Sequence, residues 1–100
     1  MSRKPNTTKI GESWSQLTII LVWSKAKTII GQEPSKYRMD NCGSIMEFSK
    51  HGDRNSEFGW EIDHINPVAN DGDDNLDNLQ PLNWKNNLAK SDKLNWKCGE

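Results

Sequence analysis

Hydrophobic positions are densest between residues 14 and 26, where their spacing predicts an amphipathic helix. Ser13, followed by a glutamine three residues later, has the pattern of a capping box, so we expect the helix to begin at Trp14. Gly31 and Pro34 end a segment of helical length. The run is also rich in β-branched residues, which leaves a buried strand as the alternative. The buried face of the helix would carry Trp14, Leu17 and Leu21, and it could extend to residues 23–26.

The second half of the chain alternates short apolar stretches with polar turns. Residues 45–48 predict a short strand, residues 60–65 a second strand ended by a proline, and residues 78–82 a short extended piece. A helix is expected over residues 83–92, with Asn83 as its N-cap. Short strands and helices with mostly local contacts predict an α+β fold.

Polar segments separate these elements. Residues 1–11 read as a flexible arm, and residues 31–44 and 50–59 read as irregular or loop structure because they are rich in Gly, Pro, Asn, Asp and Ser. A length of 100 residues favours one small domain, which we place at residues 12–100.

Composition narrows the class of protein. Charged residues make up 27% and hydrophobic residues 33%, with a mean hydropathy of −0.89, but five tryptophans leave enough for a small core. These values exclude a multidomain enzyme, a coiled-coil or collagen rod and a wholly disordered chain. Because so small a core stabilises a fold weakly, a metal ion or a partner would help to hold it.

Charge is unevenly distributed along the chain. The net charge of −1 argues against a strongly basic nucleic-acid binder. Residues 1–39 nevertheless carry +5, residues 40–77 carry −8 and residues 78–100 carry +2. The acidic segment could hold a cation and the basic flanks could meet phosphate, with a merely solvated surface as the alternative.

The two cysteines, Cys42 and Cys98, belong to no Cys-x-x-Cys pair. They can form a disulfide only if their Cα atoms lie within about 7 Å, which the sequence leaves open. The apolar run at residues 17–23 is too short to span a membrane, and lysines follow it in place of a signal-peptidase site. We therefore expect a cytoplasmic protein without membrane association.

Three residues have the chemistry of a sparse metal site. Asp63 offers a carboxylate oxygen, Asn87 an amide oxygen, and His64 a ring nitrogen that can take a proton from water near neutral pH. A Mg²⁺ ion held by few protein oxygens is completed by water and phosphate, which points to phosphodiester cleavage. A lone Asp-His pair on a surface is the alternative.

Three motifs, over residues 40–93, resemble those of HNH endonucleases in order and spacing: Asp63-His64-Ile65-x-Pro67, Asn78-Leu79-Gln80-Pro81-Leu82 and Asn87-x-x-Lys90. Small stand-alone members of that family are also similar in three further segments: Val22-Trp23-Ser24-Lys25-Ala26, Arg38-Met39-Asp40-Asn41-Cys42-Gly43 and Gly59-Trp60-Glu61-Ile62-Asp63-His64.

The resemblance implies a ββα-metal fold, in which two antiparallel strands and a helix surround one divalent cation, preceded here by the N-terminal helix. It implies that Asp63 and Asn87 are the metal ligands, that His64 is the general base, and that Asn78 holds the loop between the strands. Because the last motif position is Asn rather than His, we expect Mg²⁺ or Mn²⁺ in preference to zinc. One difficulty is that strand alternation puts Asp63 and His64 on opposite faces unless the strand bends or ends there.

Many members of this family also hold a structural zinc ion with two Cys-x-x-Cys pairs. The corresponding positions here are Asn83, Asn86, Cys42 and Ile45, so we expect no structural zinc. Basic residues on or near the second helix are candidates for phosphate contact: Lys90, Lys85, Lys93 and Arg54.

The sequence therefore predicts a metal-dependent HNH endonuclease that hydrolyses phosphodiester bonds of double-stranded DNA. The family resemblance implies 5′-phosphate and 3′-hydroxyl ends. The alternatives are a metal-holding nucleic-acid-binding module that does not cut, and a metal-stabilised structural domain. A cut through both strands would need a homodimer or two sequential nicks, and the absence of a recognition module leaves specificity weak or supplied by a partner protein.

Overall fold

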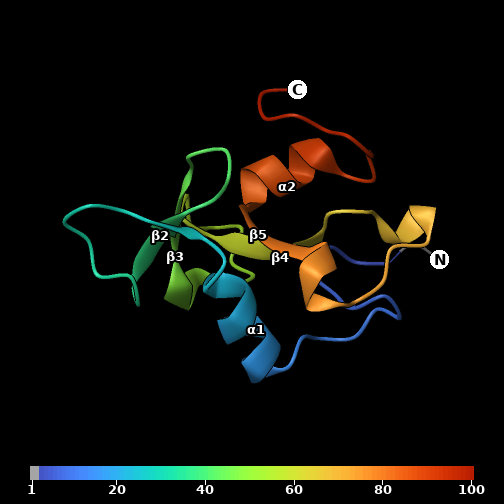
Figure 1. Ribbon diagram of the computed structural model, residues 1–100, viewed down its shortest axis with the longest axis horizontal. Helices are drawn as coiled ribbons and strands as arrows, with labels where there is room; N and C mark the ends of the chain where they lie inside the picture. The colour runs from blue at the N-terminus through green and yellow to red at the C-terminus, as the bar shows by residue number, and fades with distance from the viewer. Residues whose placement is uncertain (1–2) are drawn as a thin grey trace.

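Two small antiparallel sheets and two α-helices make up the fold of the computed structural model, which describes residues 3–100 (Figure 1). One sheet has the strand order β1-β2-β3 and the other pairs β4 with β5. The chain order is α1 (Gln16–Trp23), β1 (Lys27–Thr28), β2 (Tyr37–Met39), β3 (Ile45–Glu47), β4 (Trp60–His64), β5 (Leu79–Asn83) and α2 (Trp84–Lys90). This is the α+β class that the sequence predicts.

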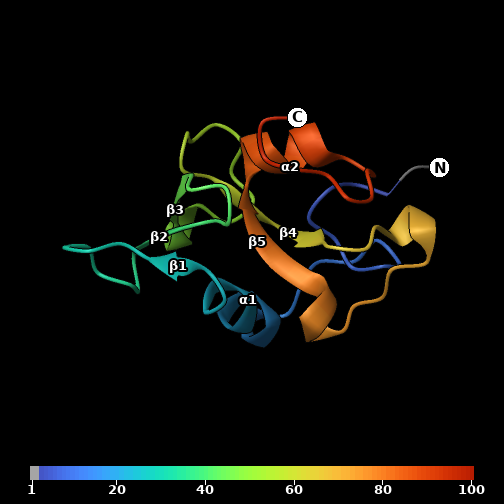
Figure 2. The same ribbon diagram turned by 45° about the horizontal axis from the view of Figure 1, so that its top comes forward.

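The β4–β5 pair lies at the centre, with α1 and α2 on opposite sides of it, as Figure 2 shows. Its register places Asp63 opposite Gln80 and His64 opposite Leu79. Pro81 is tolerated within β5 because this strand pairs on one side only, so its missing N–H interrupts no second ladder.

Aromatic side chains hold the two sheets and α1 together. Trp23 at the end of α1 packs against Trp60 of β4 with ring centroids 5.1 Å apart, and against Phe48 at 5.4 Å. The indole N–H groups of Trp23 and Trp60 donate to the backbone oxygens of Pro34 and Phe48. The core is completed by Met46, Ile62, Leu79, Val22, Ala26 and Trp14.

The N-terminal helix is present but shorter than predicted. It begins at Gln16, because Ser15 rather than Ser13 is the N-cap and accepts from the backbone N–H of Thr18. The predicted buried face is confirmed only in part: Trp14, Trp23 and Ala26 are buried, whereas Leu17 and Leu21 are 65% and 40% exposed, because the helix docks through its C-terminal end. A helix of two turns that contacts the core at one end has no continuous apolar stripe.

The longer C-terminal elements are confirmed within about two residues. Strands occur at Ile45–Glu47, Trp60–His64 and Leu79–Asn83, and Asn83 caps α2 by accepting from the backbone N–H of Lys85 at 3.0 Å. The segment predicted as irregular contains β2, and β1 lies just before it. Strands of two and three residues are too short to show the alternation that identifies a strand in sequence.

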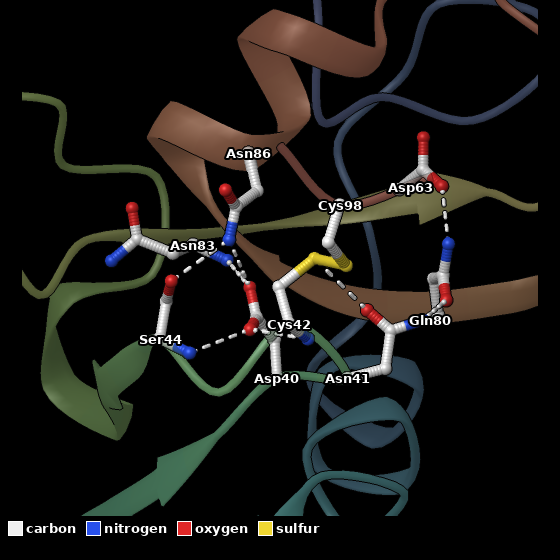
Figure 3. The surroundings of a disulfide bond; sticks show 9 residues. All are labelled: Asp40, Asn41, Cys42, Ser44, Asp63, Gln80, Asn83, Asn86 and Cys98. Atoms are coloured by element: carbon white, nitrogen blue, oxygen red, sulfur yellow. Dashed lines mark hydrogen bonds between the residues drawn. A yellow bond between two sulfur atoms is a disulfide. The ribbon is translucent and has the colours of Figure 1, made fainter. Parts of the chain in front are cut away.

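Asp40 is a buried carboxylate at the junction of the two sheets, with 1% of its surface exposed. One oxygen accepts from the backbone N–H groups of Cys42 and Ser44 at 3.0 and 2.9 Å. The other accepts from the backbone N–H of Asn83 and the amide of Asn86, both at 2.9 Å (Figure 3). Four donors satisfy the charge without a basic side chain among them.

Cys42 and Cys98 form a disulfide across 56 residues, with Cα atoms 5.5 Å apart. The sequence left this pairing open. The bond attaches the segment after α2 to the turn between β2 and β3, next to Asp40 (Figure 3).

The segment before α1 runs beside β4. The side-chain oxygen of Asn6 accepts from the backbone N–H of Ile62 at 2.8 Å and lies 3.1 Å from Nε2 of His51. The first two residues of the predicted arm lie outside the described residues, and its flexibility stays a prediction. No helix within residues 3–100 is long and apolar enough to cross a bilayer.

We predict that Asp40→Asn lowers the free energy of unfolding by about 3 kcal/mol, because an amide NH₂ would replace one acceptor facing buried N–H donors. Urea unfolding at neutral pH measures this. Asp53→Asn is the matched control, since Asp53 accepts one N–H in an exposed turn. Equal losses in the two variants would contradict a special role for Asp40.

We also predict that folding stability falls as pH is lowered from 7.5 to 5.5, in part through His51. Burial lowers the pKa of His51, with the charge of Glu61 opposing this. Below the ordinary pKa of 6.5 the unfolded chain therefore binds a proton that the folded chain does not, which favours unfolding. His51→Gln retains a donor for Asn6 and should flatten the loss in urea unfolding at a series of pH values; an unchanged slope would contradict this.

Candidate active site

Residues from β4, α2 and the N-terminal segment line a cavity of about 300 Å³. The three residues predicted to carry the chemistry, Asp63, His64 and Asn87, all belong to its lining. The other lining residues are Arg3, Pro5, Asn6, Arg54, Ile62, Leu88, Ser91 and Asp92. Of these, the sequence had singled out only Arg54 as a site residue.

Asp63 is buried on the face of β4 that meets α2. Its Oδ2 accepts from the amide of Gln80 at 2.9 Å, and its Oδ1 lies 3.3 Å from the ammonium group of Lys90. Asn41 donates to Gln80 Oε1 and so fixes which end of that amide faces Asp63. Burial raises the pKa of Asp63, and the hydrogen bond from Gln80 and the charge of Lys90 oppose the rise. A buried carboxylate that is costly to ionise gains from an added cation.

Lys90 lies within the protein rather than on its surface. It is 3% exposed, and its ammonium group also donates to the backbone oxygen of His64 at 3.0 Å. This placement gives Lys90 an intramolecular partner in place of the phosphate that we predicted for it. Lys85 and Lys93 are exposed, so both remain open to phosphate.

His64 has different partners from Asp63. Its Nε2 lies 2.8 Å from Oδ1 of Asp74, and Trp14 packs against its ring with centroids 5.6 Å apart. β4 does not bend between Asp63 and His64, because it keeps regular pairing with β5 through His64, its last residue. The two side chains therefore leave the strand on opposite faces.

The contact with Asp74 decides the tautomer of a neutral His64. An ionised carboxylate only accepts hydrogen bonds, so Nε2 carries the proton and Nδ1 is the free acceptor. Within residues 3–100 Nδ1 has no hydrogen-bond partner. Only 2% of the His64 side chain is exposed, so the ring is largely enclosed by its neighbours. Asp74 is one of four aspartates in its loop, and no sequence signal distinguished it.

Asn87 faces the cavity from α2. Its Nδ2 donates to Oε1 of Glu61 at 2.8 Å. Arg54 donates to the same carboxylate through Nε and Nη2, at 2.8 and 2.9 Å. The hydrogen bond with Glu61 raises the pKa of Arg54. Arg54 is thus paired with the carboxylate of Glu61, although 36% of the Arg54 side chain stays exposed.

Asn78 ties down the loop between β4 and β5. Its Oδ1 accepts from the backbone N–H of Asn66 at 2.8 Å, and its Nδ2 donates to the backbone oxygens of Asn66 and Asp73 at 3.2 and 2.8 Å. This loop carries Asp74 to His64.

The donor set fits a hard divalent cation. No group of three or more His, Cys, Asp or Glu in the described part of the chain could hold a metal ion. The oxygen donors that line the cavity include the carboxylate of Asp63 and the amide oxygen of Asn87, together with Asn6, Ser91 and Asp92. Mg²⁺ binds through one or two carboxylates and keeps several waters or phosphate oxygens, so two protein oxygens beside an open cavity suit it.

Comparison with known proteins gives one match. The family model described as HNH endonuclease matches residues 40–93, a stretch that includes β3, β4, β5 and α2 and therefore the three residues at the cavity. No curated protein and no solved structure matches the chain. Members of the family generally hydrolyse phosphodiester bonds and usually use a divalent metal. On this match over more than half of its length, the chain belongs to the HNH endonuclease family.

Proposed function

We propose that this protein is a metal-dependent endonuclease that hydrolyses phosphodiester bonds of double-stranded DNA. The observation that carries the proposal is the joint lining of one cavity by Asp63, His64 and Asn87, with His64 held by Asp74. The family match supports the nuclease class, and the oxygen donors favour Mg²⁺ or Mn²⁺.

Asp63 and Asn87 would hold the ion. When bound, the ion supplies positive charge that offsets the charge developing on the phosphate and the leaving oxygen. The raised pKa of Asp63 means that its carboxylate lacks full stabilisation from Gln80 and Lys90, which leaves it receptive to a cation.

His64 would act as the general base through Nδ1. Water would lose a proton to this nitrogen, and its oxygen would attack phosphorus. The bond from phosphorus to the 3′ oxygen would break, and that oxygen would take a proton from solvent, which leaves 5′-phosphate and 3′-hydroxyl ends. Asp74 keeps the proton on Nε2 and stabilises the imidazolium that forms. Its role resembles that of the aspartate in a hydrolase triad, because it orients the base without taking up the proton itself.

Contacts with DNA would come from cationic side chains around the cavity. Lys85 and Lys93 are exposed near α2, and Arg3 lines the cavity from the N-terminal segment. Binding through these groups should weaken as salt concentration rises, because phosphate contacts release counterions. A homodimer or a partner protein that supplies specificity remains part of the proposal.

A cytoplasmic location also stays a proposal, and the disulfide bears on it. Disulfides persist in oxidising compartments and are rare in the reducing cytosol. In the cytosol Cys42 and Cys98 would be held together only by the surrounding fold. Thiol labelling of the protein in intact cells would tell the two states apart.

The second candidate function is a metal-holding nucleic-acid-binding module that does not cut. Two observations favour it: Lys90 pairs with Asp63, and Asp63 and His64 leave β4 on opposite faces. Unless His64 and the bound ion reach the same phosphate, cleavage would not follow from binding.

We predict metal-dependent nicking of supercoiled plasmid by the wild type in Mg²⁺ or Mn²⁺, abolished by chelator. His64→Ala should slow nicking about 10²- to 10⁴-fold, the usual contribution of a general base. His51→Gln is the matched control, because His51 lies outside the cavity lining. DNA binding by gel shift should survive in His64→Ala. A wild type that binds DNA but does not cut in either metal would favour the binding module.

A further inference from the structure

We propose that Glu61 is a positioning residue that fixes the amide of Asn87 so that its Oδ1 faces the divalent metal. Neither the motif pattern nor the family match assigns a role to Glu61. The inference rests on the proposed metal site, because Asn87 matters here as a ligand of that ion.

Glu61 is almost fully enclosed, and both of its carboxylate oxygens accept hydrogen bonds. It is 3% exposed and lies on the same face of β4 as Asp63, beneath α2. Its Oε2 accepts from Arg54 Nε at 2.8 Å, while its Oε1 accepts from Arg54 Nη2 at 2.9 Å and from Asn87 Nδ2 at 2.8 Å. The guanidinium pairs with both carboxylate oxygens, an arrangement that holds the charged form in one orientation.

The ionised carboxylate dictates how the amide of Asn87 must lie. An amide has a donor end and an acceptor end of nearly equal size, and only its oxygen can bind Mg²⁺. A carboxylate can only accept, so it selects the NH₂ end of Asn87 and turns the oxygen away. Reversing the amide would place two oxygens about 2.8 Å apart and lose a hydrogen bond in a buried site. The free amide oxygen is therefore fixed before any ion arrives.

Glu61 is poorly suited to be a ligand itself. Arg54 already holds both of its oxygens through two hydrogen bonds, so an ion would compete with the guanidinium for the same carboxylate. Asp63, two residues along the same face of β4, has a longer and weaker contact at Oδ1 and lines the cavity with Asn87. The two acidic side chains thus have different roles: Asp63 binds the ion, and Glu61 orients Asn87, the second ligand.

The decisive variant is Glu61→Gln. A glutamine can donate or accept at this place, so both orientations of Asn87 become available and the oxygen is no longer fixed. We expect the dissociation constant for Mn²⁺, measured without DNA by electron paramagnetic resonance, to rise at least about 10-fold, as for loss of other groups that orient ligands. Glu47→Gln makes the same chemical change on β3, where Glu47 only accepts from Ser49, and should leave the affinity unchanged. Urea unfolding confirms that both variants fold.

A double variant that exchanges the carboxylate and the amide between positions 61 and 87 tests the same geometry. In Glu61→Gln/Asn87→Asp the new amide at position 61 donates to the new carboxylate at position 87, which again presents a fixed oxygen. Mn²⁺ affinity should return to at least the wild-type value. A double variant that binds as weakly as Glu61→Gln would overturn the orienting role.

The wild type alone gives a further readout, which needs no variant to fold. On titration with Mg²⁺, the side-chain N–H resonances of Arg54 Nε and Asn87 Nδ2 should keep the shifts of hydrogen-bonded groups. Loss of the Arg54 hydrogen bond on metal binding would overturn the proposal in favour of Glu61 as a ligand. A wild type that binds no Mn²⁺ would overturn the proposed metal site as well, whereas equal affinities of wild type and Glu61→Gln would overturn this inference alone.

Discussion

The buried carboxylate of Asp40 fixes the position of α2, the helix that carries Asn87. A charge enclosed without a basic partner is tolerated only if donors surround it, and the four donors to Asp40 come from two places far apart in the chain. Two lie in the turn after β2 and two lie where β5 becomes α2. One of these, Asn83, is also the N-cap of α2, so the same contact that joins the sheets fixes where the helix starts. Asn87 then follows one turn later and Lys90 near the next.

Amides occupy positions where many HNH proteins carry zinc-binding cysteines. Asn83 donates to the backbone oxygens of Ile45 and Glu57, and Asn86 donates to Asp40 and to the hydroxyl of Ser44. The two amides thus join the start of α2 to residues between 40 and 57, and one of their bonds ends on the carboxylate of Asp40. The disulfide between Cys42 and Cys98 adds a covalent link at the same corner.

The sequence was informative where local signals were strong. β4, β5 and α2 could be predicted because each is long enough to show its pattern and because Asn83 is a typical cap. The motifs singled out Asp63 and Asn87, which both line the cavity. β1 and β2 were missed because they are too short for a pattern. Burial on and around α1 was predicted only in part, because it depends on which end of the helix meets Trp60.

The residues that orient the site could not be found in the same way. Glu61 looks like an ordinary polar position in an edge strand, and its importance comes from Arg54 in a loop and Asn87 on a helix. The loop aspartate that meets His64 is chosen by the path of the backbone, which Asn78 controls through its three hydrogen bonds. Such contacts form between segments that are distant in the chain, so they produce no periodic pattern in the sequence.

The bond from Ile62 to Asn6 bears on self-association of the protein. β4 pairs with β5 along one edge, and its other edge is met by Asn6 and by the short bridge from His51 to Trp60. An uncovered strand edge is a template for pairing with a second chain, and this strand carries both Asp63 and His64. The segment around Asn6 therefore prevents β4, which carries the proposed site residues, from pairing with a strand of a second molecule. Proteolytic processing or a fusion that displaces the segment around Asn6 would expose the edge of β4 and favour aggregation through the strand on which the proposed activity depends.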